Sequence, residues 1–187
     1  MGGFEGSRQR GPSVCAPAAK LLEASSDQTL PYWLLGGFAG LRRAEIERLE
    51  WKDIHFDSKR VEVKALKSKT ASRRFVDIQP NFAAWLEPYR AKTGLVCPPN
   101  LRKSLEADRA AAGLQQWPAN ALRHSFASYH LARFENAAKL AIELGHTDQE
   151  LLFRHYRELV TPQDAERYWN TFPARTAENV VPMEQAS

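Results

Sequence analysis

The sequence has few of the features that mark secreted, zinc-binding or membrane proteins. Among its 187 residues are only two cysteines, Cys15 and Cys97, which lie far apart and outside any Cys-x-x-Cys or Cys/His pattern. Neither a disulfide framework nor a zinc site is therefore indicated. The longest apolar runs, such as residues 30–39, contain proline and glycine and are too short to span a bilayer, and the N-terminus has no signal-peptide core. We expect a reducing, cytoplasmic setting.

The sequence also lacks a strong excess of either charge. Lysine and arginine number 26 against 22 aspartates and glutamates, a net charge of +4, and the pI is near 9.2. This mild basicity is compatible with a polyanionic partner but does not by itself indicate one. Hydrophobic residues make up 43% of the chain and include five tryptophans, so one compact domain with a sizeable core is expected.

Internal repeats and low-complexity tracts are absent as well. Residues 1–15 mix Gly, Pro, Ser and Arg without periodicity, as linkers and disordered termini do. We therefore expect a linker or disordered segment over residues 1–15, a folded domain over residues 16–173 and a flexible tail over residues 174–187.

What is present is a change of hydrophobic period along the chain, from helix to strand and back. Helices are expected over residues 18–26, 30–41 and 42–51. Apolar and polar residues then alternate around the turn at residues 57–60, which predicts a hairpin, and a third strand is expected over residues 74–78. Further helices are expected over residues 81–90, 101–112, 121–133, 137–144 and 149–156. The pattern predicts an α+β fold, mainly α-helical, with a small three-stranded antiparallel sheet.

A last helix has a clear start signal. Thr161 precedes Pro162, and Asp164 follows the threonine by three residues. This combination is typical of an N-cap, a proline in the first turn and a capping acid. We expect that helix to run towards Trp169.

One segment combines an arginine and a glutamate with a fixed apolar pattern. Gly40-Leu41-Arg42-Arg43-Ala44-Glu45-Ile46 is followed by Leu49, Trp51, Asp53 and Ile54. The segment resembles the first conserved box of tyrosine recombinases of the phage integrase kind, G-L-R-x-x-E-[IL]-x-x-L-x-W-x-D-[IV]. By this resemblance Arg42 is the first catalytic arginine, and Glu45 is the acidic residue that orients the site.

Three later segments fit the same family. Leu122-Arg123-His124-Ser125-Phe126-Ala127 is similar to the family's L-R-H-[ST]-F-A, so Arg123 would be the second catalytic arginine. Leu144-Gly145-His146 resembles the family's L-G-H, and Tyr156, ten residues after His146, stands where the family carries its nucleophile. Lys67 opens the basic turn where the family places its catalytic lysine, before an R-x-V strand at residues 74–78. The resemblance covers residues 30–169.

The resemblance implies a reaction in which these residue types belong together. Two arginines would stabilise the charge on the non-bridging oxygens of a DNA phosphodiester, because a guanidinium stays charged and donates two hydrogen bonds at once. Lys67, or as second choice Lys69, would protonate the leaving 5′ oxygen, and such acid catalysis contributes about 10²- to 10⁴-fold. His146 would donate to a phosphate oxygen, and Tyr156 would form a covalent 3′-phosphotyrosine. No ATP, metal or other cofactor is then expected.

One position departs from the family pattern. The family usually has His-x-x-Arg, whereas Asn120 stands three residues before Arg123. An amide donates a hydrogen bond to phosphate but does not titrate near neutral pH. Asn is also a favoured helix N-cap, so Asn120 is either a phosphate contact, a cap of the helix that carries Arg123, or both.

The expected partner is double-stranded DNA, held mainly through phosphate contacts that are insensitive to sequence. The full-length form of such a recombinase is expected to assemble as a homo-tetramer on DNA and to be associated with the nucleoid. Only about forty residues precede Arg42, so we expect the family's N-terminal core-binding domain to be absent. Candidate DNA-contacting residues are Lys69, Arg73, Arg74, Arg102, Lys103 and His124.

Alternative interpretations remain for single residues and for the whole chain. Taken alone, Lys67 could be a solvated lysine in a turn, and His146 could interact with the dipole at the C-terminus of a helix. Arg123 taken alone could pair with a carboxylate. The glycine run at residues 36–40 is better explained by helix packing than by a phosphate loop, because it does not follow a strand. The chain is an active strand-transfer enzyme, a DNA-binding remnant or regulator without catalysis, or a type IB topoisomerase. The L-R-H-[ST]-F-A and L-G-H spacing favours integrases over topoisomerases.

Overall fold

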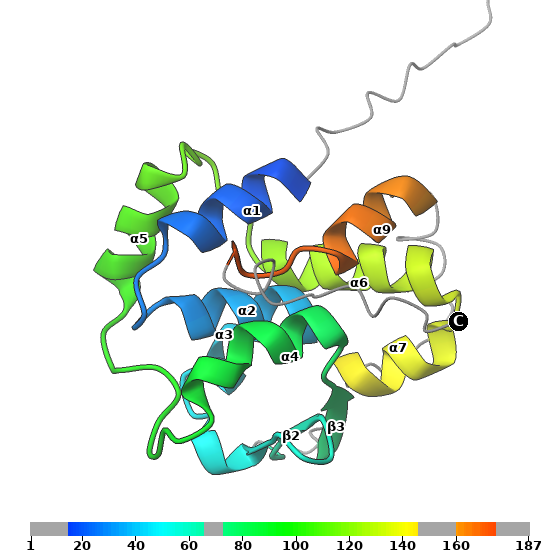
Figure 1. Cartoon of the computed structure of the whole chain (residues 1–187), viewed down its shortest axis with the longest axis horizontal. Helices are drawn as coiled ribbons and strands as arrows, with labels where there is room; N and C mark the ends of the chain where they lie inside the picture. The colour runs from blue at the N-terminus through cyan, green and yellow to red at the C-terminus, as the bar shows by residue number, and fades with distance from the viewer. Residues whose placement is uncertain (1–14, 66–72, 146–159, 175–187) are drawn as a thin grey trace, which may run out of the picture.

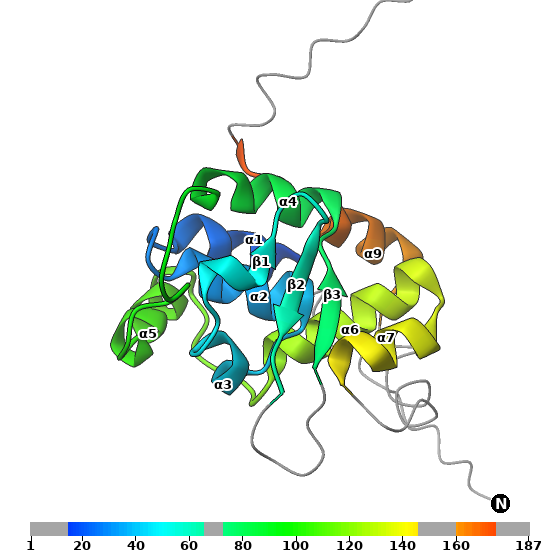
Figure 2. The ribbon, with the colours of Figure 1, turned by 90° about the horizontal axis from the view of Figure 1, so that it is seen from below.

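The computed structural model describes residues 15–65, 73–145 and 160–174. Within them the fold is mainly helical with one small antiparallel sheet, as predicted (Figures 1 and 2). The helices are α1 Cys15–Ala24, α2 Leu30–Ala39, α3 Arg43–Ile46, α4 Pro80–Leu86, α5 Arg102–Ala111, α6 Ala121–Phe134, α7 Ala137–Leu144 and α9 Pro162–Trp169, with 3-10 turns η1 Trp51–Asp53 and η2 Glu87–Tyr89. The strands are β1 Ile54–His55, β2 Arg60–Val63 and β3 Arg74–Asp77.

Helix α2 lies at the centre of the core and contacts α1, α3, α4 and α6. Its close approach to α6 requires glycine, because a Cβ on Gly36 would lie 2.4 Å from Leu122 Cδ1. Gly40 ends the helix with a left-handed φ of 62°, a conformation that costs glycine little. The glycine run therefore serves helix packing, as expected.

The sheet has the order β1-β2-β3, with Ile54 opposite Val61 and Val61 opposite Val76. Val61 and Val76 are fully buried, so one face of the hairpin packs on the core. Since side chains alternate along a strand, Arg74 shares the inward face of β3 with Val76. The edge strand β3 contacts α7 (Figure 2).

The helix expected over residues 42–51 is a single turn, α3. After it, the Trp51 amide donates to the Gly94 carbonyl at 2.9 Å, and the Val96 amide donates to the Leu49 carbonyl at 2.9 Å. This pairing buries Leu49 and stacks Trp51 on Tyr89. The prediction of a longer helix was wrong because tertiary pairing outweighs the local helical pattern.

Two other helix expectations can be compared with the described residues. Helix α9 begins as predicted, with the Thr161 hydroxyl accepting from the Asp164 amide at 3.1 Å. The helix expected over residues 81–90 ends at Leu86 and tightens into η2 around Pro88, because proline has no amide hydrogen to continue it. The helix expected over residues 149–156 lies outside the described residues. No described helix has the length and apolar content needed to cross a membrane.

Candidate functional site

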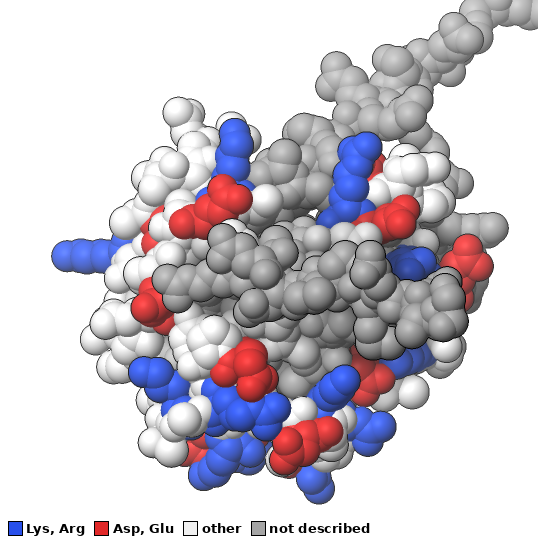
Figure 3. All heavy atoms as spheres, viewed as in Figure 1, with Lys and Arg blue, Asp and Glu red and all other residues white. Residues whose placement is uncertain are grey.

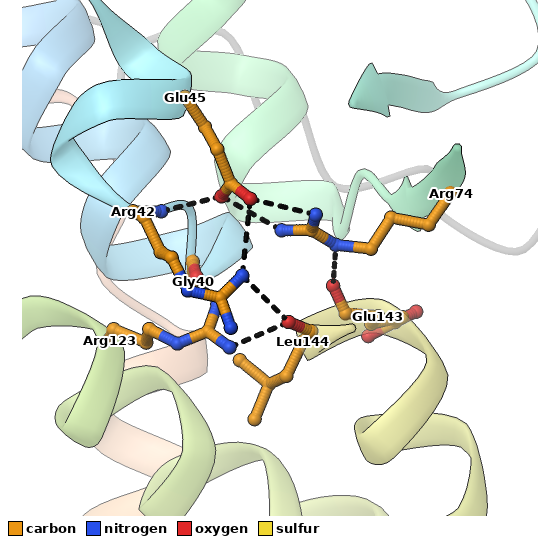
Figure 4. A network of polar contacts seen from close by, with 7 residues as sticks. All are labelled: Gly40, Arg42, Glu45, Arg74, Arg123, Glu143 and Leu144. Atoms are coloured by element: carbon orange, nitrogen blue, oxygen red, sulfur yellow. Dashed lines mark hydrogen bonds and ion pairs between the residues drawn. The ribbon is translucent and has the colours of Figure 1, made fainter. Parts of the chain in front are cut away.

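The predicted arginines meet where four elements come together: the start of α3, the start of β3, the first turn of α6 and the end of α7 (Figure 4). These elements belong to distant parts of the sequence. The fold therefore assembles the site, and local sequence alone does not.

Glu45 joins the first arginine to the fold. Its carboxylate accepts the Arg42 backbone amide at 2.7 Å and Arg42 Nη1 at 3.2 Å. The Glu45 side chain is 4% exposed, whereas that of Arg42 is 41% exposed. The buried Glu45 carboxylate thus holds Arg42 in place, while part of the Arg42 side chain stays exposed to solvent.

Arg74 is a second partner of the same carboxylate. Its Nη1 and Nη2 donate to the two Glu45 oxygens, each at 2.9 Å, and its Nε donates to the Glu143 carbonyl at 2.7 Å. We expected Arg74 to contact DNA, but its side chain is only 6% exposed. The geometry corrects that expectation: Arg74 faces the core and holds Glu45 in place.

The two arginines also fix the ionisation of Glu45. Burial alone would raise the pKa of Glu45, but hydrogen bonds from Arg74 and from the Arg42 backbone, together with the two positive charges, lower the pKa below its ordinary value. Glu45 is therefore ionised at neutral pH and balances buried positive charge.

Arg123 is buried at the start of α6 and is held by backbone carbonyls. Its Nη1 donates to the Gly40 carbonyl at 2.7 Å, and its Nη2 donates to the Leu144 carbonyl at 2.6 Å. Arg42 Nη1 reaches the same Leu144 oxygen at 3.5 Å. These contacts bring the two predicted catalytic arginines together, and they show two backbone carbonyls among the partners of Arg123.

Helix ends explain why carbonyls are available there. Glycines with left-handed φ, Gly40 at 62° and Gly145 at 64°, end α2 and α7. The last carbonyls of a helix have no intrahelical partner and carry partial negative charge, which favours arginine nearby. A Cβ on Gly145 would lie 3.3 Å from Arg74 Cδ, so glycine also makes room for Arg74. Sequence reasoning missed these acceptors, and the terminating glycines were the available signal.

Asn120 occupies the N-cap position of α6, but its side chain makes no capping hydrogen bond. Its φ is 57°, a left-handed conformation that Asn tolerates better than most residues. The side-chain capping role considered for Asn120 is therefore wrong. Asn120 and His124 are both exposed near Arg123.

The other candidate DNA-contacting residues within the described chain lie on the surface. Arg73 pairs with Glu62 at 2.8 Å and covers the Phe75 ring. Arg102 pairs with Glu106 at 2.9 Å, and Lys103 is exposed beside it on α5. Helix α5 lies on the opposite flank from α7 in both views (Figures 1 and 2).

Four predicted site residues lie outside the described residues: Lys67, Lys69, His146 and Tyr156. Two of them are close in sequence to described residues of the site. Lys67 belongs to the connection between β2 and β3, whose ends pair Val63 with Arg74. His146 follows Gly145, the residue after the Leu144 carbonyl.

Charges on the described surface are mixed. Figure 3 shows lysine and arginine interspersed with aspartate and glutamate along the lower edge of the molecule, where Figure 1 shows the sheet. Typical pairs are Lys64 with Asp53 at 2.6 Å and Arg60 with Asp77 at 3.4 Å. No group of three or more His, Cys, Asp or Glu within the described ranges is placed to hold a metal ion.

Comparison with known proteins identifies the family. Residues 20–161 match the model of the phage integrase family, and the chain belongs to that family. No protein of curated function matches the sequence significantly.

Solved structures share the fold at low identity. The chain is 17% identical to XerA recombinase (TM-score 0.64), covering 82% of this chain and 61% of that one. It is 20% identical to the catalytic domain of bacteriophage HP1 integrase (TM-score 0.57), covering 91% of this chain and 95% of that one. It is 23% identical to XerH site-specific recombinase, solved bound to palindromic difH substrate in a post-cleavage complex (TM-score 0.53), covering 74% of this chain and 46% of that one. The chain thus spans less than two thirds of XerA and XerH and nearly all of the HP1 catalytic domain.

Proposed function

We propose that this chain is the catalytic domain of a site-specific recombinase that cuts and rejoins DNA through a covalent 3′-phosphotyrosine. The observation that supports this most is the convergence of Arg42 and Arg123 on the Leu144 carbonyl, at 3.5 and 2.6 Å. Two guanidiniums fixed on one oxygen suit the two non-bridging oxygens of a phosphodiester. Family membership and the fold of the HP1 catalytic domain support the same activity.

In the proposed reaction the Tyr156 oxygen attacks the phosphorus and its phenolic proton passes to water or to another group, because Asn120 cannot accept it. The bond from phosphorus to the 5′ oxygen breaks, and Lys67 gives that oxygen a proton. Arg42 and Arg123 stabilise the charge that develops on the non-bridging oxygens, and His146 donates to one of them. Because the phosphotyrosine keeps the energy of the phosphodiester, rejoining needs neither ATP nor another cofactor. Lys69 is the second choice for the acid.

Supporting residues act on this centre from two directions. Glu45 orients Arg42 from the protein side, while the exposed Asn120 donates to the phosphate in place of the usual histidine. The proposed partner is double-stranded DNA, and the structure of XerH recombinase bound to its palindromic difH substrate supports a nucleic-acid partner. Arg73, Arg102, Lys103 and His124 contribute phosphate contacts, and the full-length recombinase acts as a homo-tetramer.

A catalytically silent DNA-binding remnant is the second candidate. One observation favours it: asparagine stands at position 120, where the family usually has histidine. Covalent adduct formation separates this candidate from the first.

The test uses nicked suicide substrates, which lose the leaving strand after cleavage and trap the covalent intermediate. Candidate sites would come from DNA flanking the gene. We expect a covalent protein–DNA band with the wild type and none with Tyr156→Phe, which removes one oxygen and retains DNA binding. If no substrate gives a band while DNA binding is measurable, the remnant is the correct function.

The acid is tested separately with a substrate whose 5′ bridging oxygen is sulfur. A thiolate leaves without a proton, so Lys67→Ala should slow cleavage of normal DNA far more than cleavage of the sulfur substrate. Equal slowing of both would exclude Lys67 as the acid and direct the same test to Lys69.

A further inference from the structure

A buried polar pair joins α6 to the last turn of α7. His130 on α6 and Glu143 on α7 have side chains that are 1% and 5% exposed, and His130 Nε2 lies 3.3 Å from Glu143 Oε2. The imidazole is otherwise packed among aromatic rings, with ring centroids at 5.3 Å for Phe126, 4.7 Å for Phe134 and 6.3 Å for Trp169. The approach lacks hydrogen-bond geometry, and neither ring nitrogen of His130 has a hydrogen-bond partner among the described residues. Because a buried carboxylate and a buried imidazole are less favourable apart than together, their approach to 3.3 Å constrains where α7 can lie.

Glu143 also contacts the sheet on its other side. Its Oε1 accepts the Asp77 amide of β3 at 3.4 Å. The same oxygen lies 3.9 Å from Lys139 Nζ, which itself binds Asp77 Oδ2 at 2.7 Å. The Glu143 carboxylate therefore links the end of α7 to both α6 and β3.

The backbone of this turn is what the arginines contact. The Glu143 carbonyl accepts Arg74 Nε at 2.7 Å, and the next carbonyl, of Leu144, accepts Arg123 at 2.6 Å and Arg42 at 3.5 Å. A shift of this single turn would displace the acceptors of all three guanidiniums (Figure 4).

We infer that His130 and Glu143 are a positioning pair that sets the place of the last turn of α7, and through its carbonyls the place of Arg42, Arg74 and Arg123. Neither side chain is exposed enough to touch DNA, so the pair acts only through the arginines. The consequence for cleavage rests on the proposed function, whereas the consequence for Arg74 does not.

Four variants separate positioning from simple packing. Glu143→Leu breaks the pair and leaves His130 buried alone, while His130→Leu combined with Glu143→Leu removes both polar groups and restores an apolar contact. Glu143→Gln keeps the shape of the side chain: its one carbonyl oxygen can still accept the Asp77 amide, and its NH2 can donate to an unprotonated His130 Nε2. The matched control is Asp108→Leu, which breaks another buried polar contact, from Trp33 Nε1 at 2.8 Å, between α2 and α5.

The first readout needs no activity: hydrogen exchange at Arg74 Nε, followed by NMR in the free protein. Because this proton is donated to the Glu143 carbonyl, we expect slow exchange in the wild type, in Glu143→Gln and in Asp108→Leu. We expect at least about tenfold faster exchange in Glu143→Leu and in the double variant. Wild-type exchange in a folded double variant would overturn the proposal.

The second readout is the ratio of adduct formation on a normal scissile phosphate to that on a neutral methylphosphonate. Guanidiniums in place favour the charged phosphate, so loss of their position should lower this ratio about tenfold in the double variant and leave it unchanged in Asp108→Leu, whatever the change in melting temperature. Adduct formation with an unchanged ratio would contradict the positioning role. Absence of any adduct from the wild type would instead contradict the proposed function, and Arg74 exchange would still decide the positioning role.

Discussion

Each face of α3 has an arginine–glutamate pair, but one pair is buried and the other is exposed. On its inner face Glu45 binds Arg74 and Arg42, and the Glu45 and Arg74 side chains are 4% and 6% exposed. On its outer face Glu47 binds Arg43 at 2.6 Å, and these side chains are 47% and 60% exposed. The neighbours make the difference, because β3 and α7 cover one face and solvent covers the other.

The contribution of an arginine–glutamate pair to stability therefore depends on how deeply the pair is buried. An exposed pair is screened by water and contributes little to stability, whereas a buried pair leaves a costly charge when one partner is removed. The inner pair also positions a guanidinium of the site, and the outer pair does not.

The largest expected effect comes from removing the inner acid. Glu45→Ala would leave Arg74 buried without its carboxylate and should destabilise the fold by about 3–5 kcal/mol. The matched change on the outer face, Glu47→Ala, should cost about 0.3–0.5 kcal/mol. Urea unfolding of both variants measures the difference, and equal losses would show that burial does not distinguish the two faces.

The next effect extends the comparison to Arg123 and Arg90. Arg123 is buried and held by carbonyls, whereas Arg90 forms exposed pairs with Glu87 and Asp57. Arg123→Ala should lower the rate of adduct formation per folded molecule about 10²- to 10³-fold, as loss of a donor to transition-state charge does. Arg90→Ala should cleave at the wild-type rate. A wild-type rate for folded Arg123→Ala would remove Arg123 from the reaction.

A smaller effect is expected in the pH dependence of stability. The pKa of Glu45 is lowered in the folded protein, despite burial, by Arg74 and Arg42. Its pairing therefore stabilises the fold above the unfolded pKa of about 4.3, and this contribution is lost as pH falls below that value towards the folded pKa.

Unfolding free energies of the wild type and Glu45→Gln, measured between neutral and acidic pH, should converge as pH falls. A constant gap between wild type and Glu45→Gln would contradict the linkage.

The smallest expected effect concerns Asn120. Glycine adopts the left-handed backbone of this position at no cost, so Asn120→Gly removes the amide and keeps the conformation. We expect severalfold slower adduct formation with Asn120→Gly. Asn120→His should be faster than wild type, with a new pH dependence near the imidazole pKa. If Asn120→Gly cleaves at the wild-type rate, the amide has no part in the reaction.

Local patterns predicted much of the fold. The alternation around residues 57–60 predicted the hairpin, and the Thr161-Pro162 signal predicted the start of α9. Motifs predicted that Arg42 and Arg123 belong to one site, and the structure brings them to one carbonyl. The hairpin and the helix start depend on short-range sequence, which is why they could be predicted, whereas the joint site of the two arginines was implied by the family resemblance.

Tertiary contacts set the remaining features. Helix α3 ends at Ile46 because the residues that follow it pair with residues 94–96. No local sequence pattern predicts that pairing. Arg74 was predicted to contact DNA, although its spacing from the buried Val76 places it on the inward face of β3. The Gly40 and Leu144 carbonyls have no side-chain signature, so only the glycines that end their helices point to them.

We propose that the arginines at the end of α7 bind the phosphate that Tyr156 attacks. The most direct test is to trap the wild-type chain on a suicide substrate, digest the adduct with protease and nuclease, and locate the attached nucleotide by mass spectrometry. We expect one nucleotide attached through its 3′ phosphate to Tyr156. The amount of adduct should fall in Arg123→Ala and stay at the wild-type level in Arg90→Ala. Attachment to any other residue, or adduct formation that survives Tyr156→Phe, would contradict it.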